Sequence, residues 1–195
     1  MKRKTFDQLV SAAGLFLAAV LVVAGSLLVW AHNFVGDEVH SQLAAQQIYF
    51  PAKDSKAIAG PEYAAVRKYG GEQLTTGAQA KAYADHFIAV HLKEIGGGKT
   101  YAQLSAQAQA NPTDTKLAGT VQTMFRGETL RGLLLNAYAF DTMGTIAGIA
   151  AIAAYLAAAV LMVLGLLGLW HSRRVPATEE VLAGSHRPAP QLATT

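Results

Sequence analysis

The sequence predicts an all-α protein in which two transmembrane helices enclose an extracytoplasmic helical bundle. Two apolar runs, residues 9–31 and 142–170, contain no Lys, Arg, Asp or Glu. A bilayer core about 30 Å thick requires roughly 20 apolar residues in a helix that rises about 1.5 Å per residue. Both runs are longer than that. Between them no stretch alternates with the period of a strand, so we predict no β-sheet.

Composition agrees with two apolar spans and excludes several function classes. Only 15% of the 195 residues are charged, against about 25% in soluble domains. The chain has no cysteine, which rules out disulfides, thiolate metal sites and cysteine nucleophiles. No basic stripe is interleaved with aromatic residues, so we expect no nucleic-acid partner.

Charge placement predicts the topology. Residues 32–141 carry equal numbers of acidic and basic side chains, so the net charge of +3 comes from the two ends. Short basic flanks stay in the cytoplasm, and the basic flanks here are Lys2, Arg3 and Lys4 and then Arg173 and Arg174. We therefore predict a two-span plasma-membrane protein with cytoplasmic residues 1–8 and 171–195, spans at 9–31 and 142–170, and extracytoplasmic residues 32–141. The alternative is that the first run is a cleaved signal peptide, but signal cores have about 7–15 residues, and we favour an anchor.

The first span is expected to begin at a cap formed by Thr5 and Gln8, because Ser/Thr followed three residues later by Glu/Gln satisfies free backbone amides. Trp30 and Trp170 stand at span ends, as interfacial aromatic residues do. Beyond Trp30 the helix is expected to continue for a few turns and to break at Pro51.

The central segment is predicted to hold several shorter helices. Pro61 opens a short one, and capping boxes at Thr76 and Thr100 begin helices over 77–95 and 101–110. A further helix begins at Thr113 or Asp114 and runs toward the second span. The apolar face predicted for the helix over 77–95 consists of Ala80, Ala84, Phe87, His91 and Ile95. The proline-containing tail, residues 175–195, is predicted to be disordered.

Small residues recur in both spans and are candidates for helix packing. In lipid, small side chains let two helix backbones approach closely, which replaces the missing hydrophobic driving force. They mark either the contact between the two spans or a homo-oligomer interface, unless they reflect only how common Ala and Gly are in membrane helices. The candidates are Ser11, Gly14, Ala18, Gly25, Gly144, Gly148 and Ala151.

A charged segment precedes the second span and is a candidate docking surface. It contains Arg126, Glu128 and Arg131, and the last two stand three residues apart on one helix face. The simpler interpretation is a helix whose charges meet lipid headgroups. The more specific one is a polar contact with the extension of the first span, where Asp37 and Glu38 lie.

Histidine and carboxylate residues are the remaining candidates for chemistry. The pairs Asp37 with His40 and His91 with Glu94 each stand three residues apart, so each offers two ligands from one helix face. A metal enzyme using His40, His86 and His91 is therefore an alternative. The spacing does not match the Glu-x-x-His pattern of helical metal centres, so we expect no metal, no cofactor and no catalytic residue.

Two segments carry a resemblance to known proteins. RGETLRGLLLNAY (126–138), followed by a Gly/Ala-rich span, and YGGEQLTTGAQAKAYADHFIAVHL (69–92) resemble a group of two-span membrane proteins of actinobacteria without established function. The resemblance covers most of the chain and implies an actinobacterial plasma membrane. Some members carry the label of an aromatic ring-opening dioxygenase, an activity that needs an iron site for which this sequence offers no ligand set.

These observations favour a non-enzymatic integral membrane protein with an accessory, interaction or scaffold role. The expected partners are the lipid bilayer and other membrane or envelope proteins, and a homo-oligomer is an alternative. A metal-dependent membrane-anchored enzyme and a small oligomeric channel are the alternative functions.

Overall fold

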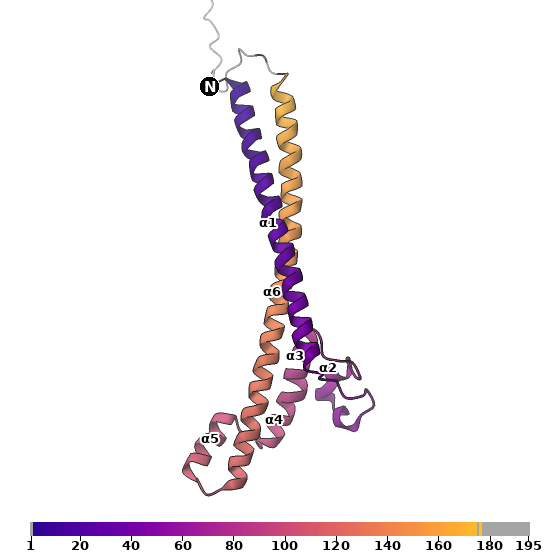
Figure 1. Cartoon of the computed structure of the whole chain (residues 1–195), viewed down its shortest axis with the longest axis vertical. Helices are drawn as coiled ribbons and strands as arrows, with labels where there is room; N and C mark the ends of the chain where they lie inside the picture. Colours follow the sequence, from indigo (N-terminus) through magenta and orange to yellow (C-terminus); the bar gives the residue numbers. More distant parts are fainter. Residues whose placement is uncertain (1, 175, 177–195) are drawn as a thin grey trace, which may run out of the picture. The chain divides into compact units, whose positions relative to one another are not determined.

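The computed structural model describes residues 2–174 and residue 176, and these residues form helices connected by turns (Figure 1). Two isolated residues, Tyr49 and Gln73, form a single antiparallel bridge, and no strand forms in the described part of the chain. The predicted all-α class is thereby confirmed. The elements in order are α1 (Arg3–Ala45), 3₁₀ turns η1 (Lys56–Ile58) and η2 (Pro61–Tyr63), α2 (Ala64–Arg67), α3 (Gly77–Tyr83), the π-helical turn η3 (Ala84–Ile88), α4 (Ala89–Ile95), α5 (Tyr101–Ala110) and α6 (Thr115–Ser172).

Helices α1 and α6 are each long and apolar enough to span a membrane. In their most apolar 18-residue windows only 11% of α1 and 17% of α6 is buried inside the structure. A core helix of a soluble protein would instead be mostly buried.

The chain divides into two compact units, and each is described by itself. The terminal unit contains α1 up to Val29 and α6 from Ile149 onward. The central unit comprises Trp30–Gly148. The predicted tail, residues 175–195, lies outside the described residues apart from residue 176.

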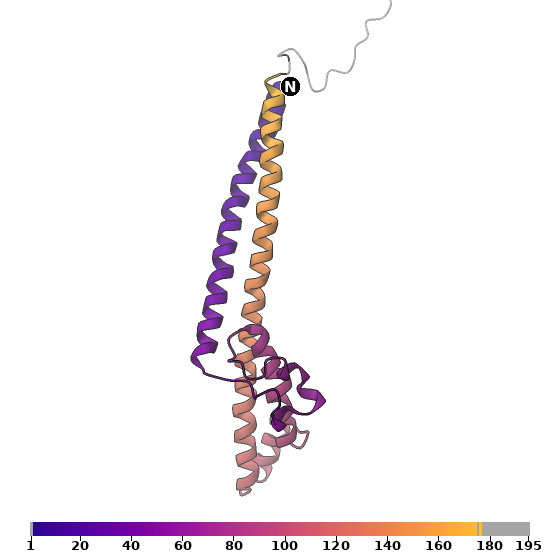
Figure 2. The same cartoon turned by 90° about the vertical axis from the view of Figure 1, so that its right-hand side faces the viewer.

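In the terminal unit, α1 and α6 run side by side with opposite directions (Figures 1 and 2). Their buried positions recur every seven residues, which is the spacing of a left-handed helix pair. Most of these side chains are small, so the two backbones approach closely. The buried positions are Ser11, Ala18 and Gly25 on α1, and Ala151, Ala158, Gly165 and Ser172 on α6.

The central unit has one hydrophobic core. It is formed where α2, α3, η3 and α4 pack on one another and on the parts of α1 and α6 that belong to this unit. Figure 1 shows α4 and α5 beside the first turns of α6. The largest fully buried side chains of this core are Leu43, Ile58, Leu74, Met124, Leu134 and Val66.

Local sequence signals position most of these helices. Thr76 and Thr100 each form a complete capping box, with Gln79 and Gln103 as partners. Helix α5 spans Tyr101–Ala110, as predicted. Gly97 and Gly98 adopt φ of +57° and +80° in the turn after α4, a backbone conformation that glycine adopts without steric cost. Asp114 accepts a hydrogen bond from the Leu117 amide at 2.9 Å and so caps α6.

Two predicted boundaries of the first helix are wrong. Helix α1 begins at Arg3, so Thr5 lies inside its first turns instead of capping it. Its end comes at Ala45, before Pro51, and Gln47 then adopts a positive φ of 52°. The chain turns there because residues 48–50 pair with residues 72–74. The Leu74 amide donates to the Ile48 carbonyl at 2.8 Å, and the Phe50 amide donates to the Glu72 carbonyl at 2.9 Å.

The predicted buried face of the helix over 77–95 is wrong in its second half. In η3 the Ala89 amide donates to the Ala84 carbonyl five residues earlier, so this turn holds one extra residue. After it, Ile88 and Leu92 are buried, whereas Ile95 is 47% exposed. The predicted Phe87 and His91 are only half-buried. The wide turn thus advances the buried face by one residue.

Candidate binding groove of the central unit

A groove lies between the last turns of α1 and the middle of α6, within the central unit, and has a volume of about 390 Å³. Phe34 on α1 and Leu133 and Phe140 on α6 line it, and each is more than half exposed. Exposed large apolar side chains gathered in one place typically mark an interaction site.

Polar groups line the same groove. Glu38 and Gln42 on α1 and Gln46 just after it follow one another at four-residue intervals, and Asn136 on α6 lines the same groove. The Gln42 side-chain amide donates to Glu38 Oε1 at 2.5 Å. The lining includes one carboxylate and no Lys, Arg or His. It therefore offers an apolar surface, three amides and one negative charge, a set suited to binding and not to nucleophilic or metal chemistry.

The predicted docking residues lie elsewhere in the central unit. Arg131 pairs with Asp85 of η3 at 3.2 Å and with Glu128 at 3.5 Å. Asp85 also binds Lys81 at 2.6 Å. Arg131 therefore connects α6 with η3, and its partner from another element is Asp85 and not Asp37 or Glu38, which the more specific of the two interpretations named. Arg126 is exposed and lines a separate shallow hollow beside α4.

The charges of this cluster act on one another. The hydrogen bond from the Lys81 ammonium lowers the pKa of the Asp85 carboxyl below its usual value, and the Arg131 guanidinium lowers it further. The same bond raises the pKa of Lys81. Arg131 Nε is buried without a hydrogen-bond partner, so the guanidinium uses only its two outer nitrogens. The ion pairs of this cluster hold η3 against α6 and so stabilise the central unit.

The histidines and carboxylates of the described residues do not form a metal site. No group of three His, Asp or Glu side chains in residues 2–174 is close enough to hold an ion. His91 Nδ1 donates to the Phe87 carbonyl at 2.7 Å, and its ring packs on the Phe87 ring with centroids 4.4 Å apart. Tyr63 packs against the same two rings, and its burial raises its pKa. His91 is thus part of an aromatic cluster.

The helix-packing candidates fall in both units. In the terminal unit a Cβ added at Gly25 would lie 3.1 Å from the Tyr155 ring, and the Ser26 and Tyr155 hydroxyls lie 3.0 Å apart. Gly14 has more room, since a Cβ there would meet only the Leu161 carbonyl oxygen at 4.0 Å. Ser11, Ala18 and Ala151 occupy the buried heptad positions described above.

Gly144 and Gly148 face α1 within the central unit, and their neighbour is a histidine. His32 Nδ1 donates to the Gly144 carbonyl at 2.8 Å. A Cβ added at Gly148 would lie 3.1 Å from the same ring nitrogen. The space that Gly144 and Gly148 leave is therefore filled by the His32 ring and the Val35 side chain of α1.

Apart from Glu38, which the sequence suggested as a docking partner, the groove residues were not among the sequence candidates. Their signal in the sequence is an apolar residue repeated among polar ones after the first span, at Phe34, Val35 and Val39, but its partner on α6 is about 100 residues away along the chain. No protein-family model, curated protein or solved structure matches this chain. Its function is therefore argued from its own residues.

Proposed function

We propose that this chain is a non-enzymatic integral protein of a bacterial plasma membrane, with an extracytoplasmic helical domain that binds a partner protein of the membrane or envelope. The observation that carries the proposal is the groove between α1 and α6, whose exposed Phe34, Leu133 and Phe140 lie beside a single carboxylate. An actinobacterial membrane is the setting that the sequence resemblance implies.

Membrane insertion is supported by the outward-facing apolar side chains of the terminal unit. Phe16, Leu27, Leu156 and Leu164 are each more than half exposed, which is favourable in lipid and unfavourable in water. The basic residues at both ends support cytoplasmic termini. Residues 32–141 are then extracytoplasmic.

The partner that fits the groove is an apolar α-helical segment that presents a Lys or Arg. The α1 wall runs from Phe34 to Gln46, which is about 18 Å at 1.5 Å per residue, or three turns of a docked helix. Helix-in-groove binding uses apolar anchors at such spacings. The lining has one carboxylate, Glu38, and no cation of its own, so a cation on the partner is complementary in charge.

Photo-crosslinking in the organism's own membranes tests this proposal. A benzophenone amino acid at Leu133 faces the groove, whereas the same residue at Gln122 lies on an exposed position of the same helix and serves as the control. We expect an adduct to a second membrane or envelope protein from position 133 only. Equal adducts at both positions, adducts to lipid alone, or a dimer of this chain would contradict the proposed partner.

Two charge reversals test whether the Glu38 carboxylate is needed for the partner to bind. Glu38→Lys removes the carboxylate of the groove, and Asp37→Lys changes the neighbouring exposed residue, which does not line the groove. We expect the first to abolish the adduct and the second to leave it. A reporter fused near Lys99 checks the topology separately, since a cytoplasmic signal would refute the extracytoplasmic placement.

A further inference from the structure

A second groove lies within the terminal unit, between the first turns of α1 and the last turns of α6, with a volume of about 490 Å³. Its walls are apolar, and three of the residues that line it are glycines: Gly14, Gly165 and Gly168. Because glycine has no side chain, these positions leave space between two helices that are otherwise in contact.

There is room for an added side chain at Gly14, whereas neighbouring atoms fill the space beside Gly165 and Gly168. A Cβ at Gly168 would overlap Ser11 Oγ, and a Cβ at Gly165 would lie 2.8 Å from Leu15 Cγ. At Gly14 the nearest atom to such a Cβ is the Leu161 carbonyl oxygen, at 4.0 Å. The free volume is thus beside Gly14 and is bounded by apolar side chains.

One oxygen of the half-buried Asp7 carboxylate lines this groove without a hydrogen-bond partner among the described residues. Asp7 Oδ2 is buried and accepts no hydrogen bond. His171 lines the same groove, yet no hydrogen bond joins it to Asp7 among the described residues. A buried carboxylate oxygen without a donor is unfavourable. A ligand that brings N–H groups to Asp7 would remove this penalty.

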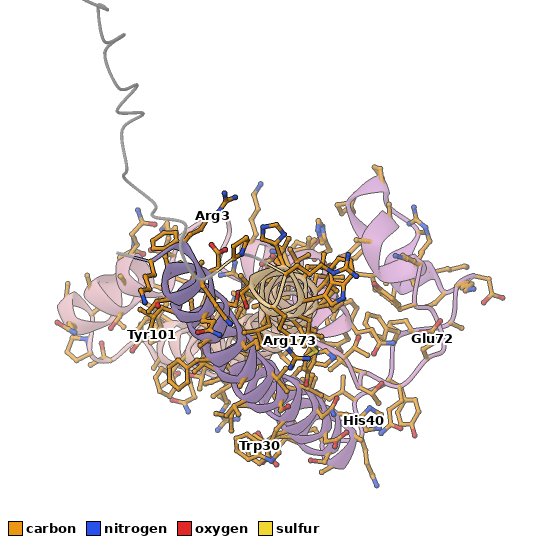
Figure 3. All side chains as sticks on the ribbon, turned by 90° about the horizontal axis from the view of Figure 1, so that it is seen from above. Arg3, Trp30, His40, Glu72, Tyr101 and Arg173 are labelled. Carbon is orange, nitrogen blue, oxygen red and sulfur yellow. The ribbon has the colours of Figure 1, made fainter. Side chains whose placement is uncertain are left out.

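Basic side chains surround the same end of the terminal unit. Lys2, Arg3 and Lys4 precede Asp7, and Arg173 and Arg174 follow His171. Figure 3 labels Arg3 on α1 and Arg173 just after α6. The Arg174 guanidinium lies 3.8 Å from the centroid of the Trp170 ring, a contact typical of the membrane interface. Such a cluster attracts phosphate groups of lipids.

We propose that this groove binds a phospholipid whose headgroup carries a primary ammonium next to its phosphate. The ammonium donates to Asp7 Oδ2, the phosphate pairs with Lys2, Lys4 and Arg173, and an acyl chain occupies the apolar space beside Gly14. A quaternary ammonium has no N–H to donate, and a headgroup without a cation leaves the Asp7 carboxylate unpaired. The site therefore selects phosphatidylethanolamine over phosphatidylcholine and phosphatidylglycerol. This inference rests on the proposed membrane insertion.

Native mass spectrometry of the full chain in mild detergent tests the selectivity. The probes are phosphatidylethanolamine, phosphatidylcholine and phosphatidylglycerol with identical acyl chains, each titrated separately. We expect the first to bind about tenfold more tightly than the second, because charge-assisted hydrogen bonds are the strong ones. Equal binding of these two lipids to the unmodified chain overturns the proposal.

Three variants assign the selectivity to the groove. Asp7→Asn removes the negative charge, and we expect the preference for phosphatidylethanolamine to fall to less than about twofold. Gly14→Leu fills the free space and should weaken binding of all three lipids. Gly36→Leu is the matched control, since it lies on the same helix with nothing within 4 Å of its added Cβ, and it should bind as the unmodified chain does. A preference that survives Asp7→Asn overturns the assignment.

Carbonate extraction of membranes separates this inference from the proposed function. If the chain washes off the membrane at alkaline pH, both are wrong. If the chain stays in the membrane and shows no headgroup preference, the lipid site alone is wrong.

Discussion

Two glycines of α6 provide a sharp test of the packing in the central unit. Gly127 and Gly132 stand on the same helix, but only Gly127 meets a neighbour. A Cβ at Gly127 would lie 3.1 Å from Leu92 Cγ and Cδ1, and its nearest neighbour is Leu92 Cδ2, whereas a Cβ at Gly132 would have nothing within 4 Å. Leu92 is 5% exposed and lies in the core. The substitution to Ala therefore has the same effect on the helix at both sites and a different effect on packing.

The magnitudes follow from these contacts. Replacing Gly by Ala inside a helix stabilises it by about 0.5–1 kcal/mol, so Gly132→Ala should raise the free energy of unfolding by that amount. At Gly127 the added methyl pushes on Leu92, and overpacking of this kind costs about 1–3 kcal/mol. Gly127→Ala should thus be less stable than Gly132→Ala by about 1–3 kcal/mol.

Hydrogen exchange of the full chain in mild detergent measures this difference where it arises. Peptides covering 88–95 and 120–135 should exchange about 5–150-fold faster in Gly127→Ala than in Gly132→Ala, because a tenfold change corresponds to about 1.4 kcal/mol. Adding Leu92→Val to Gly127→Ala should restore most of the protection, as expected for two residues in contact. Equal exchange in the two single variants would refute the close approach of α4 and α6.

Two further predictions concern polar contacts. The hydrogen bond from Lys81 is the main cause of the lowered pKa of Asp85, so the stabilisation is complete above the ordinary carboxyl pKa and is lost as the pH falls through the lowered value. Lowering the pH from about 6 to about 3 should therefore reduce the thermal unfolding temperature of the unmodified chain more than that of Asp85→Asn. Equal reductions in the two proteins would contradict this. Tyr155→Phe removes the 3.0 Å contact with the Ser26 hydroxyl and should destabilise the helix pair by about 0.6 kcal/mol. Ser26→Ala should add nothing to it in the double variant, and additive losses in thermal unfolding would show that the two hydroxyls do not interact.

Signals contained within a few residues were predictable from the sequence. The capping boxes at Thr76 and Thr100 and the helix end at Ile95 each depend on neighbouring residues only, and all three are observed. The continuation of α6 from Thr115 through the second apolar run is also observed. Local hydrogen bonds and hydropathy determine these features, so periodicity and turn residues suffice to find them.

Features that depend on distant residues were not predictable. The wide turn at Ala84–Ile88 leaves no mark in the helical pattern, because an extra residue is accommodated by packing and not by composition. Asp85 is not on the apolar face predicted for the helix over 77–95, yet it binds Arg131 on α6. The candidate groove likewise arises from the pairing of α1 with α6, whose facing residues are about 100 positions apart.

The wide turn also has a bearing on how this chain should be aligned with others. A relative that lacks one residue between 84 and 88 would have an ordinary α-helix there, and its buried face would follow the simple 3.6-residue period. Because the missing residue is the extra one that the wide turn holds, the equivalent of Leu92 would still face the equivalent of Gly127, and a side chain at the latter position would still meet the leucine. A deletion in 84–88 together with a retained glycine at 127 would be the signature of that change across sequences.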